Sequence, residues 1–419
     1  MAFSRSRHMS SVSRETKPTQ PVLNLTDRQF KADPFSIYAQ LRRDNPVAKA
    51  KLGSLPTWIV TRYDDVVEIL KNDRVFVKNY KNAQSLEQQR KRPWMPASLR
   101  ALESNMLDQD NPDHLRLRSL VHKAFTPQRM EEMRPRIQSI AESLLISSQQ
   151  RGRGDLIADF ALPLPLTVIV ELLGIPTEDR QKFHRWAKYV LNSPTMLNML
   201  LAIPAIMAQM KYLKQLFAKR RSNPQDDLLT ALVQAEADGD RFSEDELVAM
   251  VFLLMLAGHE TTVNLISSGT LALLQHPEQL ALLRRSPELI KSAVEELVRF
   301  TAPVETATER YAAEDVIIAD TKIAKGEMVL VALASANRDE RQFTNPDQLD
   351  ITREKNRHVG FGLGIHYCLG APLARMEAQI GLQLLTDLRP NLRLAVPAEQ
   401  LRWRSTAVVR GLEALPVEW

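Results

Sequence analysis

The only cysteine of this 419-residue chain lies in a glycine-rich segment, FGLGIHYCLG at residues 361–370. Four of the 14 glycines fall within eleven residues here, at Gly360, Gly362, Gly364 and Gly370. Such a concentration indicates a backbone that turns tightly or passes close to a flat group. Cys368 stands just before an expected helix, whose free N–H groups favour a thiolate over a thiol. The chemistry that uses one buried thiolate is axial ligation of haem iron.

Other interpretations of Cys368 compete with an iron ligand. A lone cysteine is most often a small buried apolar residue, and from the residues alone this interpretation stays open. A phosphate-binding loop needs Gly-Lys-Ser or Gly-Lys-Thr after its glycines, and a c-type haem needs Cys-x-x-Cys-His; neither motif is present. A zinc site needs more soft ligands than Cys368 and His366 supply.

A second candidate segment, AGHETT at residues 257–262, lies inside a long apolar helical pattern. Glycine in a helix interior costs about 1 kcal/mol relative to alanine, so Gly258 indicates contact with a flat group or a local opening of the helix. Glu260 and Thr261 set a carboxyl beside a hydroxyl, and such a pair can pass protons into a dry site. The competing interpretation is that Thr261 bonds back to a preceding carbonyl while Glu260 is solvated. A zinc-binding His-Glu-x-x-His motif is excluded because Val263 occupies the second histidine position.

The helix that carries this segment has a clear predicted start. Ser243 and Glu246 have the spacing of a capping box, and the apolar pattern that follows continues to His276 and stops at Pro277. Its length is about 34 residues, or roughly 50 Å at 1.5 Å per residue. A helix this long, apolar on nearly every side, is expected to cross the middle of the molecule.

Around this helix the sequence predicts a mainly helical protein with small sheets, an α+β fold class. From residue 114 to about 274 the periodicity is helical, with breaks expected at prolines that include Pro204. A long aperiodic excursion precedes it at residues 78–113. The other expected elements are strands at 57–61, 316–318 and 328–331 and helices at 63–72, 287–302 and 371–388.

The amino-acid composition limits which classes of protein this chain can belong to. The chain is 44% hydrophobic and 25% charged, which is ordinary for a soluble globular protein. Its net charge of +5, on 55 basic and 50 acidic residues, is too balanced to indicate nucleic-acid binding. A single cysteine forbids an intrachain disulfide and favours a reducing compartment.

Residues 1–22 are basic and rich in serine, and we expect a mobile tail there before a single domain at residues 23–419. The tail has no apolar stretch for a signal peptide or an anchor, and Met9 makes residues 1–8 a candidate leader. The most apolar internal run, residues 247–258, is too short to span a bilayer. We therefore expect a cytoplasmic monomer that binds neither membrane nor nucleic acid.

These motifs resemble those of the cytochrome P-450 family and occur in the family's order over nearly the whole chain. The cysteine segment is similar to the family's haem-binding loop, Phe-x-x-Gly-x-His/Arg-x-Cys-x-Gly, at Phe361, Gly364, His366, Cys368 and Gly370. The segment at 257–262 is similar to the family's Ala/Gly-Gly-x-Asp/Glu-Thr element. The resemblance implies a triangular-prism fold, with haem b between the long central helix and the helix after the cysteine.

The resemblance also implies roles for individual residues. Cys368 is expected to ligate the iron, and Glu260 and Thr261 to deliver protons to iron-bound dioxygen. The residues expected to lie against the haem are Ala257, Gly258, Phe361, Gly362 and Gly370. Those expected to meet its two propionates are His114, Arg118, Arg310 and His366. Each of these four alone is more often a surface basic residue, so their joint occurrence carries the argument.

Glu296 and Arg299 stand three residues apart on the helix predicted from residue 287. As an exposed pair they would contribute only about 0.3–0.5 kcal/mol. They resemble the family's buried Glu-x-x-Arg pair, which a third arginine joins, and Arg353 is the candidate for it. The implied role is folding and haem retention rather than chemistry, because a lost partner leaves a buried charge unpaired.

The implied function is that of a haem-thiolate monooxygenase, which inserts one atom of O2 into a lipophilic small molecule. The chain shows no flavin or iron–sulfur motif, so its electrons are expected from an external ferredoxin and ferredoxin reductase. A basic docking face is predicted from Arg116, His122, Lys123 and Arg375. Two alternatives stay open: a peroxide-driven haem-thiolate enzyme, and a non-catalytic haem-binding or sensor protein.

A substrate pocket is expected to be lined by apolar, methionine-rich segments at residues 78–107, 191–210, 304–308 and 406–409 and by the central helix. The individual candidates are Leu253, Leu254, Ala257, Val304 and Val408. Such apolar stripes are more often protein core than ligand contact. A terpenoid, steroid, macrolide or fatty acid is compatible with this lining, and none of them is favoured.

Overall fold

A computed structural model of the chain describes residues 22–92, 96–148, 152–179, 182, 196–237, 239–406 and 408–419. The predicted tail, apart from Val22, lies outside the described residues. So do residues 191–195, the first part of one segment predicted to line the pocket. The fold is mainly helical with small sheets, which confirms the predicted α+β class.

The longest described helix is α13 (Glu244–Gln275), whose 32 residues agree with the predicted central helix. Its start is the predicted capping box, because the Ser243 hydroxyl accepts a hydrogen bond from the Glu246 N–H. The Glu246 carboxylate in turn accepts from the Ser243 N–H at 2.8 Å. Two donors that a helix start leaves free are thereby satisfied.

By length and composition α13 passes as a membrane span, whereas the sequence run considered above was too short. Burial decides between a membrane helix and a core helix. The fold buries 56% of the apolar window of α13, which is typical of a core helix.

Helices from most of the chain surround α13. The longer ones are α2 (Pro34–Asp44), α3 (Tyr63–Lys71), α6 (Asp113–Ala124), α8 (Arg134–Ser148), α9 (Pro163–Leu172), α11 (Met196–Ser222), α14 (Pro277–Arg285), α15 (Ile290–Thr301) and α17 (Ala371–Leu388). The shorter ones are α1 (Arg28–Ala32), α4 (Leu86–Arg90), α5 (Ala97–Arg100), α7 (Pro127–Glu132), α12 (Leu228–Gln234) and α16 (Leu333–Ala336). The predicted helices at 63–72 and 371–388 are thus present as α3 and α17.

One detail of the helix prediction was wrong, because the expected break at Pro204 does not occur and α11 runs through it. For Gly258, a local opening was one of two alternatives, and α13 is continuous there. A Cβ at Gly258 would lie 3.2 Å from Cδ1 of Ile169 on α9, so this glycine allows two helices to approach closely.

The main sheet has six strands in the order β1-β2-β3-β11-β8-β4. Their bounds are β1 (Leu23–Asn24), β2 (Val47–Leu52), β3 (Leu55–Val60), β11 (Met328–Val331), β8 (Arg310–Ala312) and β4 (Phe76–Val77). The predicted strands at 57–61 and 328–331 are β3 and β11, and they pair in parallel with Trp58 opposite Val329. The sequence pattern located both strands but not their pairing, which joins segments far apart in the chain.

Smaller sheets complete the fold. The predicted strand at 316–318 is β9, which pairs with a strand that the sequence analysis missed. The bounds are β9 (Val316–Ile318) with β10 (Thr321–Ile323), β6 (Glu236–Ala237) with β7 (Asp240–Arg241), and β12 (Arg393–Leu394), β13 (Pro416–Glu418) and β5 (Arg153–Asp155) in a three-stranded sheet.

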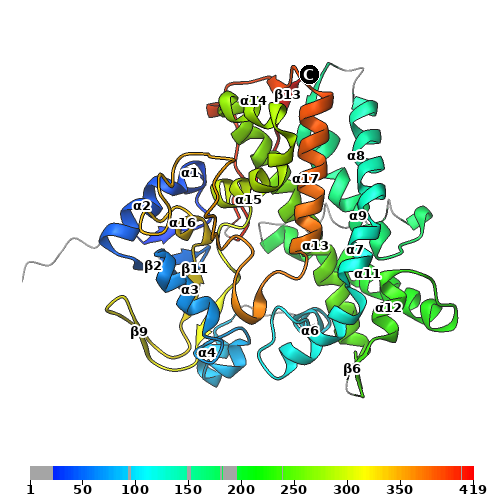
Figure 1. The fold of residues 1–419 in the computed structure, drawn as a ribbon. Coiled ribbons are helices and arrows are strands. Elements are labelled where there is room, and N and C mark those ends of the chain that lie inside the picture. The colour runs from blue at the N-terminus through cyan, green and yellow to red at the C-terminus, as the bar shows by residue number, and fades with distance from the viewer. Residues whose placement is uncertain are drawn as a thin grey trace, which may run out of the picture.

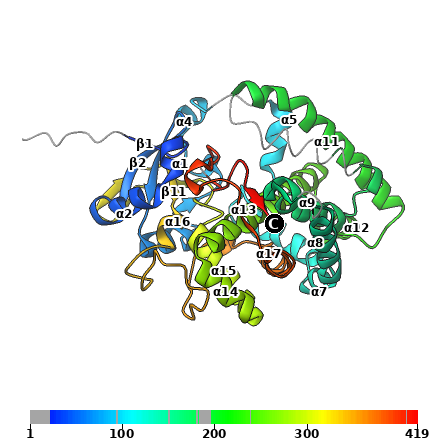
Figure 2. The same cartoon turned by 90° about the horizontal axis from the view of Figure 1, so that it is seen from above.

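The main sheet and several of the longer helices occupy different sides of the molecule. Figure 1 shows β2, β11 and the N-terminal helices on the left, and α8, α9, α11 and α12 on the right. Seen from above, α13 lies between these two parts (Figure 2). It packs against α9, α15 and α17.

The predicted group of Glu296, Arg299 and Arg353 lies together at the end of α15. The Arg299 guanidinium donates twice to the Glu296 carboxylate, at 2.7 and 2.8 Å, and both side chains are fully buried. Nε of Arg353 donates to the same carboxylate at 3.1 Å. The predicted helix from residue 287 is slightly shorter than expected, because a 3₁₀ turn (Pro287–Leu289) precedes α15.

This buried pair holds the segment that leads into the cysteine loop. Arg299 also donates to the carbonyls of Asn337 (2.9 Å), Pro346 (2.7 Å) and Gln348 (3.0 Å). The Asn337 side chain accepts from the N–H of Val359 at 2.8 Å, just before the glycines. Hydrogen bonds therefore connect α15 to the start of the loop.

We expect Arg299→Ala to lower the free energy of unfolding by about 3–5 kcal/mol, because it leaves Glu296 buried with a partner removed. Urea unfolding of the variant measures the loss. Lys91→Ala is the matched control, since Lys91 forms an exposed pair with Glu87 at 2.9 Å and is expected to change stability by less than about 0.5 kcal/mol. Equal stability changes in the two variants would contradict a structural role for Arg299.

Candidate active site

The glycines shape a tight loop between residue 359 and α17. The N–H of Gly362 donates to the Val359 carbonyl at 2.8 Å, and the N–H of Cys368 donates to the Phe361 carbonyl at 2.9 Å. Gly362 and Gly364 both have a φ of +71°, a conformation that other residues rarely adopt. A Cβ at Gly364 would lie 2.4 Å from the Leu70 carbonyl oxygen at the end of α3. The loop therefore turns tightly and also rests against another helix.

The thiol of Cys368 faces opposing influences. Burial raises its pKa, while the N–H groups of Gly370 and Ala371 and the charges of Arg118 and Arg375 lower it, and burial has the larger effect. The N–H groups at the start of α17 favour the thiolate, as expected, while burial favours the thiol. A metal ion close to the sulfur would favour the thiolate further.

A cavity separates Cys368 from α13. The empty space between its lining atoms is about 1,490 Å³, part of it open to solvent. Most of the residues predicted to do chemistry or bind ligands line it: His114, Arg118, Leu253, Leu254, Ala257, Gly258, Thr261, Val304, Arg310, Phe361, Gly362, His366, Cys368 and Gly370. Gly370 leaves room on this side, since a Cβ there would meet no atom within 4 Å.

Two predicted residues do not line the cavity. Val408 is not among the lining residues, and its carbonyl accepts hydrogen bonds from the N–H groups of Glu305 (2.8 Å) and Thr306 (3.2 Å), next to Val304. Glu260 is the other residue outside the lining.

Glu260 and Thr261 are neighbours in sequence, but their side chains diverge, because consecutive residues of a helix face different directions. The Thr261 hydroxyl lines the cavity and donates to the Ala257 carbonyl at 3.1 Å, as the competing interpretation held. The Glu260 carboxyl lies 3.5 Å from the Arg404 guanidinium and is largely buried rather than solvated. Burial raises the pKa of Glu260, and Arg404 opposes that rise.

Positive charge collects at one end of the cavity. Arg118 donates to the carbonyls of Ile365 (2.9 Å) and Tyr367 (2.8 Å), and the rings of His114 and His366 have centroids 4.2 Å apart. Burial lowers the pKa of Arg310 to about 10.

The same charges act on His366. Burial lowers its pKa to about 2, and the neighbouring charges of His114, Lys78, Arg310 and Arg118 add to that effect. Among the described residues the cavity lining contains no aspartate or glutamate. An anionic group placed here would therefore meet cations and no competing carboxylate.

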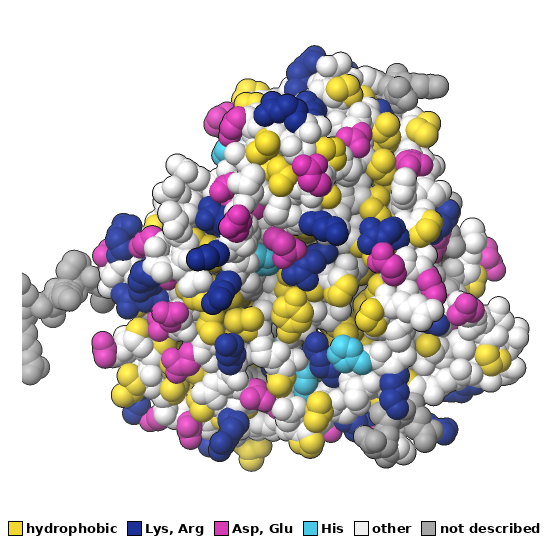
Figure 3. Space-filling model, viewed as in Figure 1, with side chains coloured by type: hydrophobic (Ala, Val, Ile, Leu, Met, Phe, Trp, Pro, Cys, Tyr) yellow, Lys and Arg dark blue, Asp and Glu magenta, His cyan; other side chains and the backbone are white. Residues whose placement is uncertain are grey.

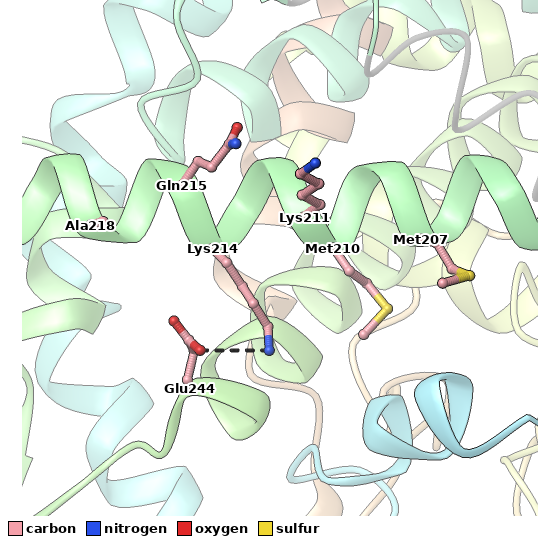
Figure 4. A pocket seen from close by; sticks show the side chains of 7 residues that line it. All are labelled: Met207, Met210, Lys211, Lys214, Gln215, Ala218 and Glu244. Carbon is pink, nitrogen blue, oxygen red and sulfur yellow. Dashed lines mark ion pairs between the residues drawn. The ribbon is translucent and has the colours of Figure 1, made fainter.

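A second hollow lies on the surface along α11 (Figure 4). Its lining includes Met207, Lys211 and Lys214, and Nζ of Lys214 forms ion pairs with Glu244 at 3.6 Å and with Asp245 at 2.9 Å. It is shallow and contains none of the residues singled out for chemistry. No group of three or more His, Cys, Asp or Glu side chains arranged to hold a metal occurs in the described part of the chain.

A model of the cytochrome P450 family matches residues 15–286 and 284–387. The chain belongs to the cytochrome P450 family. It is 43% identical to the polyketide biosynthesis cytochrome P450 PksS of Bacillus subtilis (strain 168), over 93% of this chain and 96% of that protein. It is 41% identical to the cytochrome P450 monooxygenase PikC of Streptomyces venezuelae, over 98% and 97% respectively.

Solved P450 structures have the same fold. PksS matches with a TM-score of 0.87 at 42% identity, over 94% of this chain and 98% of that one. P450BioI, in complex with hexadec-9Z-enoic acid ligated acyl carrier protein, matches with a TM-score of 0.84 at 39% identity, over 93% and 99% respectively. The P450 fold predicted from the motifs is thus confirmed, and the chain is a P450 monooxygenase of the bacterial type, an oxidoreductase.

P450 membership implies haem b, and the chemistry of the cavity fits that group. A single sulfur lies on one side, and amides at the start of α17 and two arginines act to lower its pKa against the effect of burial. Two arginines and two histidines at one end suit two propionates, and the remaining lining is largely apolar. Cys368, His114, Arg118, Arg310 and His366 are the residues that would hold the cofactor.

Sequence reasoning missed several residues of this P450 site. Lys78 is buried and donates to Thr308 (2.7 Å) and to the Glu309 carbonyl (2.6 Å), and its place in an aperiodic stretch offered no signal. Arg404 lies in the C-terminal loop, where no pattern related it to Glu260. Glu377 did offer a signal, because a carboxylate interrupts the apolar face of α17.

We expect Gly364→Ala to displace the cysteine loop, because its Cβ would overlap the Leu70 carbonyl. Overpacking strain of about 1–3 kcal/mol corresponds to roughly 5- to 150-fold weaker haem retention. Haem retention is measured as the haem-to-protein ratio that remains after incubation with apomyoglobin, which takes up released haem. Gly53→Ala is the matched control, since Gly53 also has a positive φ (+62°) but its Cβ would meet nothing within 4 Å. Equal haem loss in both variants would contradict the steric argument.

Proposed function

We propose that this P450 is a haem-thiolate monooxygenase that hydroxylates or epoxidises a lipophilic small molecule. One observation carries the proposal: the sulfur of Cys368 faces α13 across a cavity with cations at one end and no carboxylate in its described lining. When bound there, haem b would supply activation of O2, with the thiolate donating electron density that favours O–O cleavage. The other parts of the cavity orient the substrate and manage protons.

Thr261 and Glu260 are the proposed proton donors of the site. The Thr261 hydroxyl must turn from the Ala257 carbonyl toward the cavity to donate. Glu260 holds a proton more readily than an exposed glutamate, because burial raises its pKa. Its route to Thr261 requires the carboxyl to leave Arg404, which lies 3.5 Å away.

The substrate is proposed to be apolar because the cavity wall opposite the cysteine loop is apolar. Leu253, Leu254 and Val304 line that wall, together with Ala257. Hydrophobic pockets with few polar groups bind ligands mainly by burying apolar surface. The chain's own residues thus specify a lipophilic class and not one compound.

The electrons are proposed to come from a ferredoxin and its reductase. Two of the four residues predicted for docking form ion pairs within the protein. Arg116 pairs with Glu246, Asp240 and Asp113. Arg375 pairs with Glu295 at 2.6 Å. On the face of Figure 3, basic and acidic side chains are interspersed. The proposed docking face keeps all four predicted residues, and these ion pairs mean that a partner would have to compete with Glu246 and Glu295 for two of them.

We further propose that the protein is a cytoplasmic monomer.

The two rival functions make different demands on the same site. A peroxide-driven enzyme needs no proton donors beside the oxygen site, and the presence of Thr261 and Glu260 favours the monooxygenase over it. A haem sensor needs no substrate wall.

Purified protein grown with a haem precursor is expected to be coloured, and its ferrous carbonyl complex to show the red-shifted Soret band of thiolate ligation. Cys368→Ser is expected to lose that band because the hydroxyl is a poor iron ligand. Lipophilic ligands that displace water from the iron will shift the Soret band and identify substrates. Product with reduced ferredoxin supports the proposal. Turnover with peroxide alone would replace it with the peroxide-driven enzyme, and haem binding without product on any redox system would favour the sensor.

Thr261→Ala is expected to lower the coupling, the fraction of reducing equivalents that ends in product, and to release hydrogen peroxide instead. General acid–base groups contribute about 10²–10⁴-fold, so a loss of at least tenfold is expected. Ser267→Ala is the matched control, because Ser267 also donates to a carbonyl four residues back on α13 (Val263, 2.7 Å) but does not line the cavity. Unchanged coupling in Thr261→Ala would remove Thr261 from the mechanism.

A further inference from the structure

A buried carboxylate stands next to the apolar part of the cavity lining. Residues 303–308, called the wall segment below, supply four of the lining residues: Pro303, Val304, Ala307 and Thr308. Glu305 lies between them in sequence but does not line the cavity, and its relative exposure is 0%. A carboxylate that is excluded from both solvent and the cavity is costly unless other groups in the protein pair with it.

The partners of Glu305 come from the first two helices of the chain. Nζ of Lys31, in the last turn of α1, donates to one carboxylate oxygen at 2.7 Å. The hydroxyl of Tyr38, on α2, donates to the other oxygen at 3.0 Å. All three side chains are fully buried, so water cannot take the place of a missing partner. The wall segment is therefore connected to α1 and α2 through a single carboxylate.

The C-terminal part of the chain holds the same segment by its backbone. The N–H of Glu305 donates to the Val408 carbonyl at 2.8 Å, and the N–H of Arg410 donates to the Pro303 carbonyl at 3.0 Å. The Arg410 guanidinium also donates to the Lys31 carbonyl, so the C-terminal residues, red in Figure 2, lie beside α1. Lys31 is thus fixed at its side chain by the wall segment and at its carbonyl by Arg410.

Charge makes the position of Glu305 hard to change. Burial lowers the pKa of Lys31, and it lowers that of Arg410 to about 10, while the Glu305 carboxylate opposes both shifts. One acid therefore compensates two buried cations. A movement of Glu305 away from this place would leave both cations buried without their common partner, which is strongly unfavourable.

We propose that Lys31, Tyr38 and Glu305 are positioning residues that fix the wall segment and so determine which ligand shapes the cavity accepts. They act through Val304 and Ala307, which lie next to or near Glu305 in sequence and line the cavity. Apolar contacts weaken steeply when a gap of even half an ångström opens between two surfaces, so a small shift of this segment changes ligand affinity. The inference rests on the proposed function, because it takes the cavity to bind the substrate.

The first test measures ligand discrimination in the haem-loaded protein and needs no turnover. Imidazole and 4-phenylimidazole both ligate haem iron, but only the second extends a phenyl ring into the cavity. Soret titrations give the two dissociation constants. Lys31→Met and Tyr38→Phe are each expected to weaken 4-phenylimidazole relative to imidazole by roughly 2- to 30-fold, the range typical of mutations that act through connecting residues. An unchanged ratio of the two constants in both variants would overturn the proposal.

A second measurement separates positioning from general loss of stability. Arg220→Met is the matched control, because Arg220 forms a largely buried pair with Asp227 at 2.6 Å and does not line the cavity. Urea unfolding is expected to show lower stability for both Lys31→Met and Arg220→Met, but only Lys31→Met should change the ligand ratio. An equal change of the ratio in Arg220→Met would reduce Lys31 to a structural residue and overturn the proposal. If Lys31→Met fails to fold, Tyr38→Phe decides, since it removes only one hydroxyl.

Turnover distinguishes the failure of this inference from the failure of the proposed function. With a substrate found from Soret shifts, Lys31→Met is expected to raise KM more than it lowers kcat and to change the proportions of the oxidised products. A parent protein that forms product, with both the ligand ratio and the product proportions unchanged in Lys31→Met and Tyr38→Phe, would overturn the positioning role alone. A parent that binds haem but forms no product on any redox system would overturn the proposed function, while a changed ligand ratio would still support the fixing of the wall segment.

Discussion

The sulfur of Cys368 has to face α13 across an open space, and much of the fold serves that requirement. Burial raises the pKa of the thiol, whereas the amides at the start of α17 and two arginines lower it, and a metal cation beside the sulfur would favour the thiolate. The loop that presents the sulfur is held from two directions. Gly364 rests against the end of α3, and the Glu296–Arg299 pair connects α15 to the start of the loop through Asn337. A buried ion pair far from the chemistry thus becomes part of cofactor retention.

The cavity divides its polar groups by charge. Arg118 and Arg310 belong to its lining, whereas Glu260 lies against Arg404 outside that lining. Among the described residues no carboxylate therefore lines the cavity, and the hydroxyls that α13 presents to it are those of Thr261 and Thr262. Hydroxyls carry no charge but can relay protons, so they suit a wall that faces a lipophilic ligand.

Local sequence patterns predicted the elements well where the signal was local. The capping box at Ser243 and the apolar run after it predicted α13, and the glycines around Cys368 predicted a tight loop. The failures came from tertiary packing. Pro204 did not end α11, and Gly258 served the approach of Ile169 rather than an opening of the helix. The pairing of β3 with β11 was not predictable, because strands so far apart in the chain carry no sign of each other.

The sequence by itself determined the ligand-bearing motif, the central helix, the family and hence the class of chemistry, because each rests on residue types at short fixed spacings. Only the tertiary structure decided how those groups are used. It separated Glu260 from Thr261 in direction, and it paired Arg116 and Arg375 with carboxylates from other elements. The reason is physical: charge, pKa and access depend on neighbours brought together by packing, and distance along the chain does not record which neighbours those are.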